Sequence, residues 1–326
     1  MSHAGGQPTR LLTQSLVAAI GTQLRAVLLY GSHLLGAAPD RYSAHDLVVV
    51  VEDYLGTYRE LGRRGFTHRP PRLMASLARF LPPSVIAFSP EGAAGPIAKC
   101  LIISASDFER ELSARSRDHF MISRMIQEVG VLYVRDEVAE WWLDETLEGA
   151  RSTVLDWAAP YVSAPFDAES LTREMIAICY RGEIRPESGS RATPVFEAQR
   201  AYLVETYERL LEHACIEGTV VREGHGYRSV HRPGPMARLK RSVYFAYSKF
   251  RVTARWIKHV LTFENWLPYV VRKVERRTGM SVELTAWEMR LPLIFLWPRL
   301  FRVLRNRPAE EAAAERTVPP GSGSDT

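Results

Sequence analysis

The sequence predicts an α/β (α+β) fold, in which a small mixed sheet flanked by helices is followed by a mostly helical, basic C-terminal region. Two apolar runs, Ala26–Tyr30 and Asp46–Asp53, stand on either side of a turn and are typical of buried strands. Two more, Val85–Ser89 and Ile97–Ser104, are joined by a segment containing glycine and proline, which indicates a β-hairpin. After Met236, apolar residues recur at helical spacing among arginines and lysines.

Helices are expected between these strands in the first part of the chain. Leu11–Leu24 places its apolar residues on one helical face, so it predicts a helix that covers the sheet. The arginine-rich stretch Tyr54–Arg69 is either a polar helix or a loop. Arg72–Phe80 predicts a short helix, which the prolines at 82 and 83 end.

The middle of the chain is predicted to be mostly helical. A capping box from Ser106 to Glu109 begins a helical region that extends to Trp157. A short strand is expected within it at Val131–Val134. Leu171–Tyr180 then predicts a helix that begins after Asp167 or Ser170 and ends near Gly182.

The chain is predicted to divide into three parts. Residues 1–185 form the first domain, and the Pro- and Gly-containing loop 183–194 is the candidate joint. Residues 186–307 form a helical, basic region, with a long helix from Thr193 or Pro194 to His213 and a small hairpin around residues 219–227. The tail, 308–326, has no apolar periodicity and is expected to be disordered.

Composition limits the class of protein. The 326 residues are 46% hydrophobic, which is enough for a sizeable core, and the net charge of +5 favours an anionic partner. The three cysteines are far apart in apolar surroundings, so we expect small core residues in a reducing compartment rather than disulfides or a zinc site. Neither a signal peptide nor a run of about 18 apolar residues is present, so no spanning helix is expected.

The turn between the first two strands has the chemistry of a phosphate site. Gly31 lets the backbone approach a ligand closely, and Ser32 adds a hydroxyl and a backbone N–H. Asp46 begins the next strand, and Mg²⁺ prefers carboxylate and triphosphate oxygens as ligands. The alternative is an ordinary hairpin turn beside a solvated Asp46.

Lys99 is a second candidate for contact with phosphate. It interrupts a strand made otherwise of Ile, Leu and Cys, and burying an ammonium group is costly unless an anion pairs with it. Either Lys99 points at a phosphate, or it is an edge-strand lysine that faces water.

Three sequence blocks together resemble the mitochondrial translocator assembly and maintenance protein family. They are Tyr30–Ser32 with Asp46–Asp53, Ala98–Ser104 and Tyr180–Arg185, in the family's order and at roughly its spacing. Members of that family are CTP:phosphatidate cytidylyltransferases of the polymerase-β-like nucleotidyltransferase superfamily. The chain departs from the family pattern at His33, where a glycine is usual, and between residues 54 and 72, where the family's Trp-His segment is not matched.

The resemblance implies a nucleotidyltransferase-type sheet and a catalytic domain at residues 1–185. It implies transfer of CMP from CTP to phosphatidate, giving CDP-diacylglycerol and pyrophosphate, with Mg²⁺ as cofactor. Tyr30, Gly31 and Ser32 would bind the nucleotide. Asp46, helped by Glu52 or Asp53, would hold the metal.

The same resemblance assigns further residues of the site. Lys99 would offset charge on the phosphates, while Tyr180 and Arg185 would line the nucleotide site.

The second metal ligand is uncertain from the sequence. Glu52 and Asp53 are carboxylates on the same strand as Asp46, but Glu52 lies about 20 Å away at ~3.3 Å per residue. A close pair of carboxylates therefore needs another residue, for which Glu183 is a candidate.

The basic C-terminal region suggests an anionic surface as partner. Leu239, Val243 and Phe250 share a helical face, from which Arg255 and Lys258 are expected to lie away. Either this region associates with an anionic membrane, or its apolar faces pack internally and its arginines are solvated; nucleic-acid binding ranks below both. The sequence favours Leu291–Leu304 as the membrane-inserting segment, with Trp297, Phe301 and Leu304 as the inserting side chains.

The predicted location is accordingly cytoplasmic and peripheral to the inner face of the membrane, or on the matrix side in a mitochondrion. Nucleic acid is not an expected partner, and the oligomeric state does not follow from the sequence. Two other functions stay open: a nucleotidyltransferase for a soluble acceptor, such as a sugar phosphate or tRNA, and a degenerate member that binds lipid without catalysis.

Overall fold

The computed structural model describes residues 6–35, 43–90, 95–182, 192–231 and 233–262. By the density of its internal contacts, the chain divides into Met1–Glu264 and Asn265–Thr326. The second unit lies outside the described residues, and so do Leu291–Leu304 and the tail expected to be disordered.

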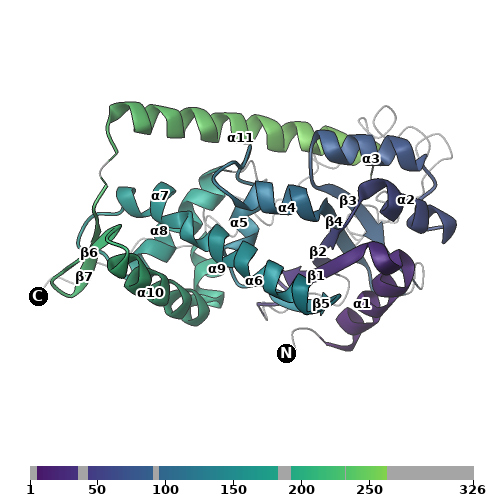
Figure 1. The fold of residues 1–326 in the computed structure, drawn as a ribbon, viewed down its shortest axis with the longest axis horizontal. Helices are drawn as coiled ribbons and strands as arrows, with labels where there is room; N and C mark the ends of the chain where they lie inside the picture. The colour runs from purple at the N-terminus through teal and green to yellow at the C-terminus, as the bar shows by residue number, and fades with distance from the viewer. Residues whose placement is uncertain (1–5, 36–42, 91–94, 183–191, 232, 263–326) are drawn as a thin grey trace, which may run out of the picture. The chain divides into compact units, whose positions relative to one another are not determined.

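The fold-class prediction is confirmed by a five-stranded mixed sheet in the order β3-β4-β2-β1-β5, flanked by helices (Figure 1). Strands β1 and β2 are antiparallel, β2 and β4 parallel, and β3 and β5 pair antiparallel at the two edges. The strands are β1 (Leu24–Tyr30), β2 (His45–Val51), β3 (Ser84–Phe88), β4 (Ala98–Ser104) and β5 (Gly130–Val134). The central three are almost continuously apolar because both faces of the sheet are covered.

One face of the sheet packs against the N-terminal helices. Side chains of α1 and α2 form a buried cluster there with alternate residues of the central strands, such as Val27 and Val49. These elements are α1 (Gln7–Ile20), the single 3-10 turn η1 (Gly21–Gln23), α2 (Tyr54–Arg63) and α3 (Pro71–Phe80). The first helix therefore ends earlier than predicted. Gly21, at φ +62°, ends α1, and Leu24 already belongs to β1.

The other face packs against the helices that follow β4. Leu28, Val48 and Leu101 join a buried cluster that continues through α8 and α10 and reaches Val252. The helices here are α4 (Ala105–Leu112), α5 (Ile122–Met125), α6 (Glu137–Ser152), α7 (Val154–Trp157), η3 (Ala159–Tyr161), α8 (Ala168–Gly182), α9 (Ala192–Ala198) and α10 (Arg200–Ile216).

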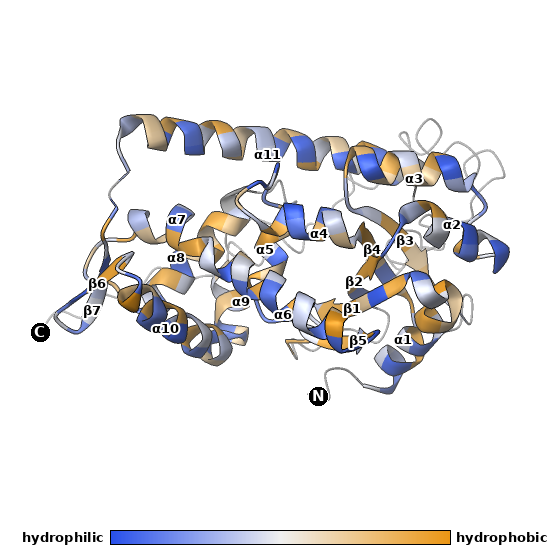
Figure 2. Cartoon of the chain, in the orientation of Figure 1, coloured by the Kyte–Doolittle hydropathy of each residue, from blue (hydrophilic) through white to orange (hydrophobic). Residues whose placement is uncertain are grey.

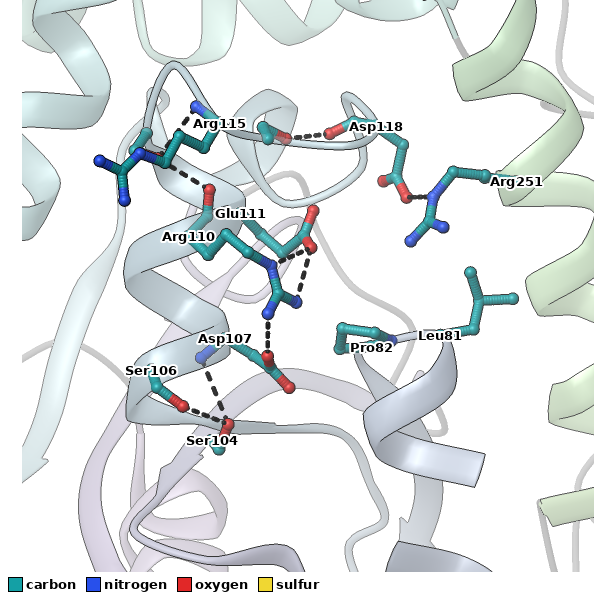
Figure 3. Close-up of polar contacts among 12 residues, drawn as sticks. Leu81, Pro82, Ser104, Ser106, Asp107, Arg110, Glu111, Arg115, Asp118 and Arg251 are labelled. Carbon is teal, nitrogen blue, oxygen red and sulfur yellow. Dashed lines mark hydrogen bonds and ion pairs between the residues drawn. The ribbon is translucent and has the colours of Figure 1, made fainter. Parts of the chain in front are cut away.

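Two local predictions in this layer need correction. Ser104, not Ser106, caps α4, because its Oγ accepts the backbone N–H of Asp107 (Figure 3). The single helix expected up to His213 is two helices, α9 and α10. The chain breaks at Gln199, whose side chain donates to Gln127.

A small hairpin and a long helix complete the described part. β6 (Val220–Glu223) and β7 (Gly226–Ser229) pair antiparallel, as predicted. Helix α11 (Pro235–Thr262) then contacts β3 and α8. None of the described helices combines the length and the hydrophobicity needed to cross a bilayer.

The sequence-based alternative in which the apolar face of α11 packs internally and its arginines are solvated is wrong for the described residues. Leu239, Val243 and Phe250 are exposed, whereas Arg255 and Lys258 are buried. The alternation of apolar and polar bands along the helix is visible in Figure 2. The basic side chains are buried because carboxylate and carbonyl oxygens are available beneath the helix.

Candidate functional site

Three residues from the sequence-based set meet where β1 ends and where β2 and β4 begin. Tyr30 pairs with Asp46 across the antiparallel ladder, and Asp46 pairs with Lys99 across the parallel one. The three therefore lie side by side on adjacent strands. The side chains of Asp46 and Lys99 are 31% and 48% exposed, so a ligand in solvent can reach both.

The Gly31 turn closes on Asp46. Gly31 has φ +79°, a conformation that side chains disfavour. A Cβ at this position would stand 3.2 Å from the Asp46 Oδ2 atom. Glycine thus avoids strain at this backbone conformation and leaves room for the close approach of the Asp46 carboxylate. Ser32 follows directly and is half-buried.

Lys99 lies on an interior strand. Since β4 is flanked by β3 and β2, Lys99 is not on an edge strand, although its side chain is exposed to solvent as that alternative expected. Its Nζ atom is 3.9 Å from Asp46 Oδ1, a loose ion pair. Between two partly exposed groups such a pair contributes about 0–1 kcal/mol to stability. Lys99 and Asp46 therefore lie together at a solvent-accessible strand end, and their pairing has little effect on the free energy of unfolding.

A pair of histidines borders the turn, and the sequence analysis did not assign them a role. His33 stacks on His45 with ring centroids 3.8 Å apart, and His33 Nε2 contacts the Ser43 carbonyl oxygen at 2.9 Å. His45 Nδ1 contacts the hydroxyl of Thr9 at 3.1 Å. Burial and the neighbouring His33 lower the pKa of His45 to about 4, so it is neutral at pH 7.

Glu52 and Asp53 lie at the opposite end of β2 from Asp46. Glu52 Oε1 pairs with Arg25 at 2.9 Å and with Arg135 at 2.7 Å. Asp53 caps α2 by accepting the Gly56 N–H and also pairs with Arg79. The structure therefore does not bring these two carboxylates to Asp46, because β2 is extended along its whole length.

The remaining predicted residues lie on or beyond α8. Tyr180 is half-buried on α8 and packs against the same apolar cluster as Tyr30. Glu183 and Arg185 lie outside the described residues.

Helix α11 packs basic groups against the start of β3, where Ser84 pairs with Ile102 near the far end of β4 from Lys99. The Lys258 Nζ atom donates to the Pro83 carbonyl at 2.8 Å and to Ser84 Oγ at 3.1 Å, at the start of β3. The adjacent His259 has a buried, unpartnered Nε2 atom. Burial and the positive charges of Lys258, Arg255 and Lys99 lower the pKa of His259 to about 3. The basic pattern after Met236 was the sequence signal for this packing of α11 against the start of β3.

The described residues do not form a complete metal site on their own. Among them, no group of three or more His, Cys, Asp or Glu side chains is arranged to hold an ion. Asp46 is the carboxylate that the strands place beside the Gly31 turn. Two described cavities, of about 370 and 740 Å³, lie elsewhere, around Arg59 and Arg200.

Comparisons with known proteins leave the family of this chain open. No family model matches it, and no curated protein matches it. Thirteen chains of solved structures match. One is from the crystal structure of a toxin-antitoxin with AMP-PNP, at 13% identity and a TM-score of 0.24, covering 45% of this chain and 90% of that one. A match at this TM-score decides neither fold nor function.

Proposed function

We propose that this protein is a nucleotidyltransferase that transfers CMP from CTP to phosphatidate. One observation carries the proposal: the Gly31 turn, Asp46 and Lys99 meet at adjacent strand ends, and Gly31 leaves room for the close approach of the Asp46 carboxylate. The resemblance of the three sequence blocks supplies the identity of nucleotide and acceptor. Phosphatidate oxygen would form a bond to the α-phosphorus of CTP, the bond to the β-phosphate oxygen would break, and pyrophosphate would leave.

The residues present suit this chemistry, since phosphoryl transfer needs positioning and charge neutralisation more than covalent participation. The backbone N–H groups and the hydroxyl at Gly31 and Ser32 would hold the triphosphate. Lys99 would offset the negative charge that builds on the phosphates. The acceptor phosphate is already ionised at pH 7, so no strong general base is required.

Asp46 fits a magnesium ion as a single carboxylate ligand. Mg²⁺ is commonly bound in proteins by one or two carboxylates together with substrate phosphates and water, and the triphosphate would bring the remaining oxygens. When bound there, the ion would stabilise negative charge on the transferred phosphoryl group.

The direct test is incorporation of α-labelled CTP into lipid by the purified protein, with phosphatidate in detergent micelles and Mg²⁺. Asp46→Asn should lower the rate by about 100-fold or more while leaving the thermal melt unchanged, because the substitution removes charge but keeps shape. Asp144→Asn is the matched control, since Asp144 is an exposed carboxylate on α6.

The same assay is then repeated with the other nucleoside triphosphates and with soluble phosphate acceptors. If label enters a soluble phosphate acceptor and not phosphatidate, the acceptor assignment is wrong and the nucleotidyltransferase assignment stands. If no nucleotide is turned over or bound with any acceptor, the proposal fails, and a non-catalytic protein is the better description. Asp46→Asn activity within a few-fold of the wild type would remove Asp46 from the mechanism.

A further inference from the structure

Helix α11 is amphipathic, but its apolar face points away from the described elements against which the helix packs. Six large hydrophobic side chains on it are each between 50 and 69% exposed. They are Met236, Leu239, Val243, Tyr247, Phe250 and Ile257, here called the α11 stripe. At helical spacing they form one continuous face that extends over about 32 Å at ~1.5 Å per residue.

Buried polar contacts fix this orientation of the helix. Arg251 Nε and Arg255 Nη2 pair with Asp118 Oδ2 at 2.9 and 2.7 Å. Ser248 Oγ accepts the backbone N–H of His119 at 2.9 Å. Figure 3 shows Arg251 reaching from α11 to the loop that carries Asp118.

The end of the helix is anchored in the same way. Arg255 Nε and Nη2 donate to the Pro82 carbonyl at 3.0 and 2.7 Å, and Lys258 donates to the carbonyls of Leu81 and Pro83. Turning the α11 stripe inward would withdraw these cations from their partners, and leaving a buried charge unpaired costs about 3–5 kcal/mol. The stripe is therefore held outward by the fold.

The charge of α11 indicates what covers the stripe. From Pro235 to Thr262 the helix contains no Asp or Glu. At about 100° per residue, exposed Lys240 lies along one border of the stripe, whereas exposed Lys249 and Arg238 lie about 80–100° beyond the other border. A second copy of this helix would bring like charges together, which is unfavourable. An apolar face on a helix whose exposed charges are all lysine and arginine instead matches an anionic bilayer surface.

We propose that α11 binds in the plane of an anionic membrane surface through the α11 stripe. Apolar side chains would enter the interface, and each basic residue near the surface would add about 1 kcal/mol. The inference rests on the proposed function insofar as phosphatidate is met at such a surface. Its test needs neither nucleotide nor turnover, so either proposal can fail without the other.

The experiment is flotation of the full-length protein with vesicles of phosphatidylcholine alone and of phosphatidylcholine mixed with phosphatidylglycerol. The wild type should float with the anionic vesicles only, and less so as salt is raised. The double substitution Val243→Asp with Phe250→Asp should lower the bound fraction by about tenfold or more, since it puts charge into the apolar face.

Val138→Asp with Trp141→Asp is the matched control. These two residues form an exposed apolar pair on α6, 72 and 66% exposed, away from the α11 stripe. The control should bind as the wild type does. Circular dichroism melts should be unchanged in both doubles because every substituted side chain is exposed.

Three results would overturn the proposal. The first is unchanged vesicle binding by the Val243/Phe250 double, and the second is no binding by the wild type at low salt. The third is a wild-type dimer in light scattering that the same double converts to a monomer without any effect on flotation, which would assign the stripe to an interface between copies of this chain.

Discussion

At the scale of single residues, the candidate site depends on one glycine and one lysine whose surroundings differ from those of similar residues elsewhere in the chain. Gly31 and Gly218 both have positive φ, +79° and +76°. Only at Gly31 would a Cβ meet Asp46; at Gly218 nothing lies within 4 Å. Lys99 lies beside a carboxylate at a strand end that stays open to solvent.

Gly31→Ala should therefore impair both stability and function. The positive φ should cost about 1–2 kcal/mol in the free energy of unfolding, measured by urea denaturation. Nucleotide binding, measured by calorimetry, should also weaken, because the new Cβ would displace the Asp46 carboxylate. Gly218→Ala should show a similar loss of stability with unchanged binding. Equal binding by both variants would contradict a role for the close approach.

Lys99→Met should weaken nucleotide binding by about 1–3 kcal/mol, the scale of a lost charge-assisted contact. Lys99→Arg should restore part of that loss, since it keeps the positive charge. Arg209→Gln removes an exposed cation on α10 and serves as the control. If calorimetry gives the same affinity for Lys99→Met and the wild type, Lys99 does not contact the phosphates.

At the scale of elements, the notable pairing is between α11 and the loop before α5. Burial disfavours the charged form of Asp118, but Arg255 and Arg251 outweigh it and hold the pKa of Asp118 below its usual range. Burial lowers the pKa of Lys258, and the nearby arginines lower it further. Because three buried basic side chains of α11 have few carboxylates near them, the packing of the helix depends strongly on each carboxylate that contacts it.

Asp118→Asn should accordingly destabilise the protein by about 3–5 kcal/mol, because it leaves the two arginines buried without their counter-charge. Urea denaturation measures this loss, and proteolysis should cut first within α11 if the helix is released. The exposed Asp144→Asn should change the free energy of unfolding by less than about 0.5 kcal/mol. A similarly small change for Asp118→Asn would show that the ion pairs do not hold α11.

At the scale of the whole molecule, the sheet separates two apolar clusters and contributes side chains to both. Residues such as Val27 and Val49 face the N-terminal helices, and Leu28 and Val48 face the helices after β4. Two neutral histidines lie beside this core: His45, with its pKa lowered to about 4, and His259, with its pKa lowered to about 3. Unfolding would return both to an ordinary pKa of about 6.5.

Stability should therefore fall on acidification. Between about pH 6.5 and pH 4 the unfolded chain binds protons that the folded chain does not, so the free energy of unfolding decreases as pH falls through that window. Above about pH 6.5 these groups contribute no slope. His45→Gln should reduce the slope measured by urea denaturation across the window, whereas exposed His225→Gln should not. If the slope for His45→Gln equals that of the wild type, the lowered pKa of His45 does not cause the loss of stability on acidification.

The sequence determined the local elements and the position of the turn. Apolar runs of strand length predicted β1, β2, β3 and β4, and Gly31 marked the end of β1, because periodicity and glycine conformation are properties of short stretches. The Asp46–Lys99 pairing was not visible in the sequence, since it depends on the parallel register of β2 with β4.

Tertiary structure alone decided which carboxylates and which helix faces are used. The sequence motif predicted Glu52 and Asp53 as metal ligands. In the structure, both form ion pairs with arginines from other elements, at the end of β2 away from Asp46. The hydrophobic pattern of α11 predicted a helix and could not say which side is buried. Asp118 and the carbonyls before β3 decided that the basic side is buried, because pairing buried cations outweighs covering an apolar stripe.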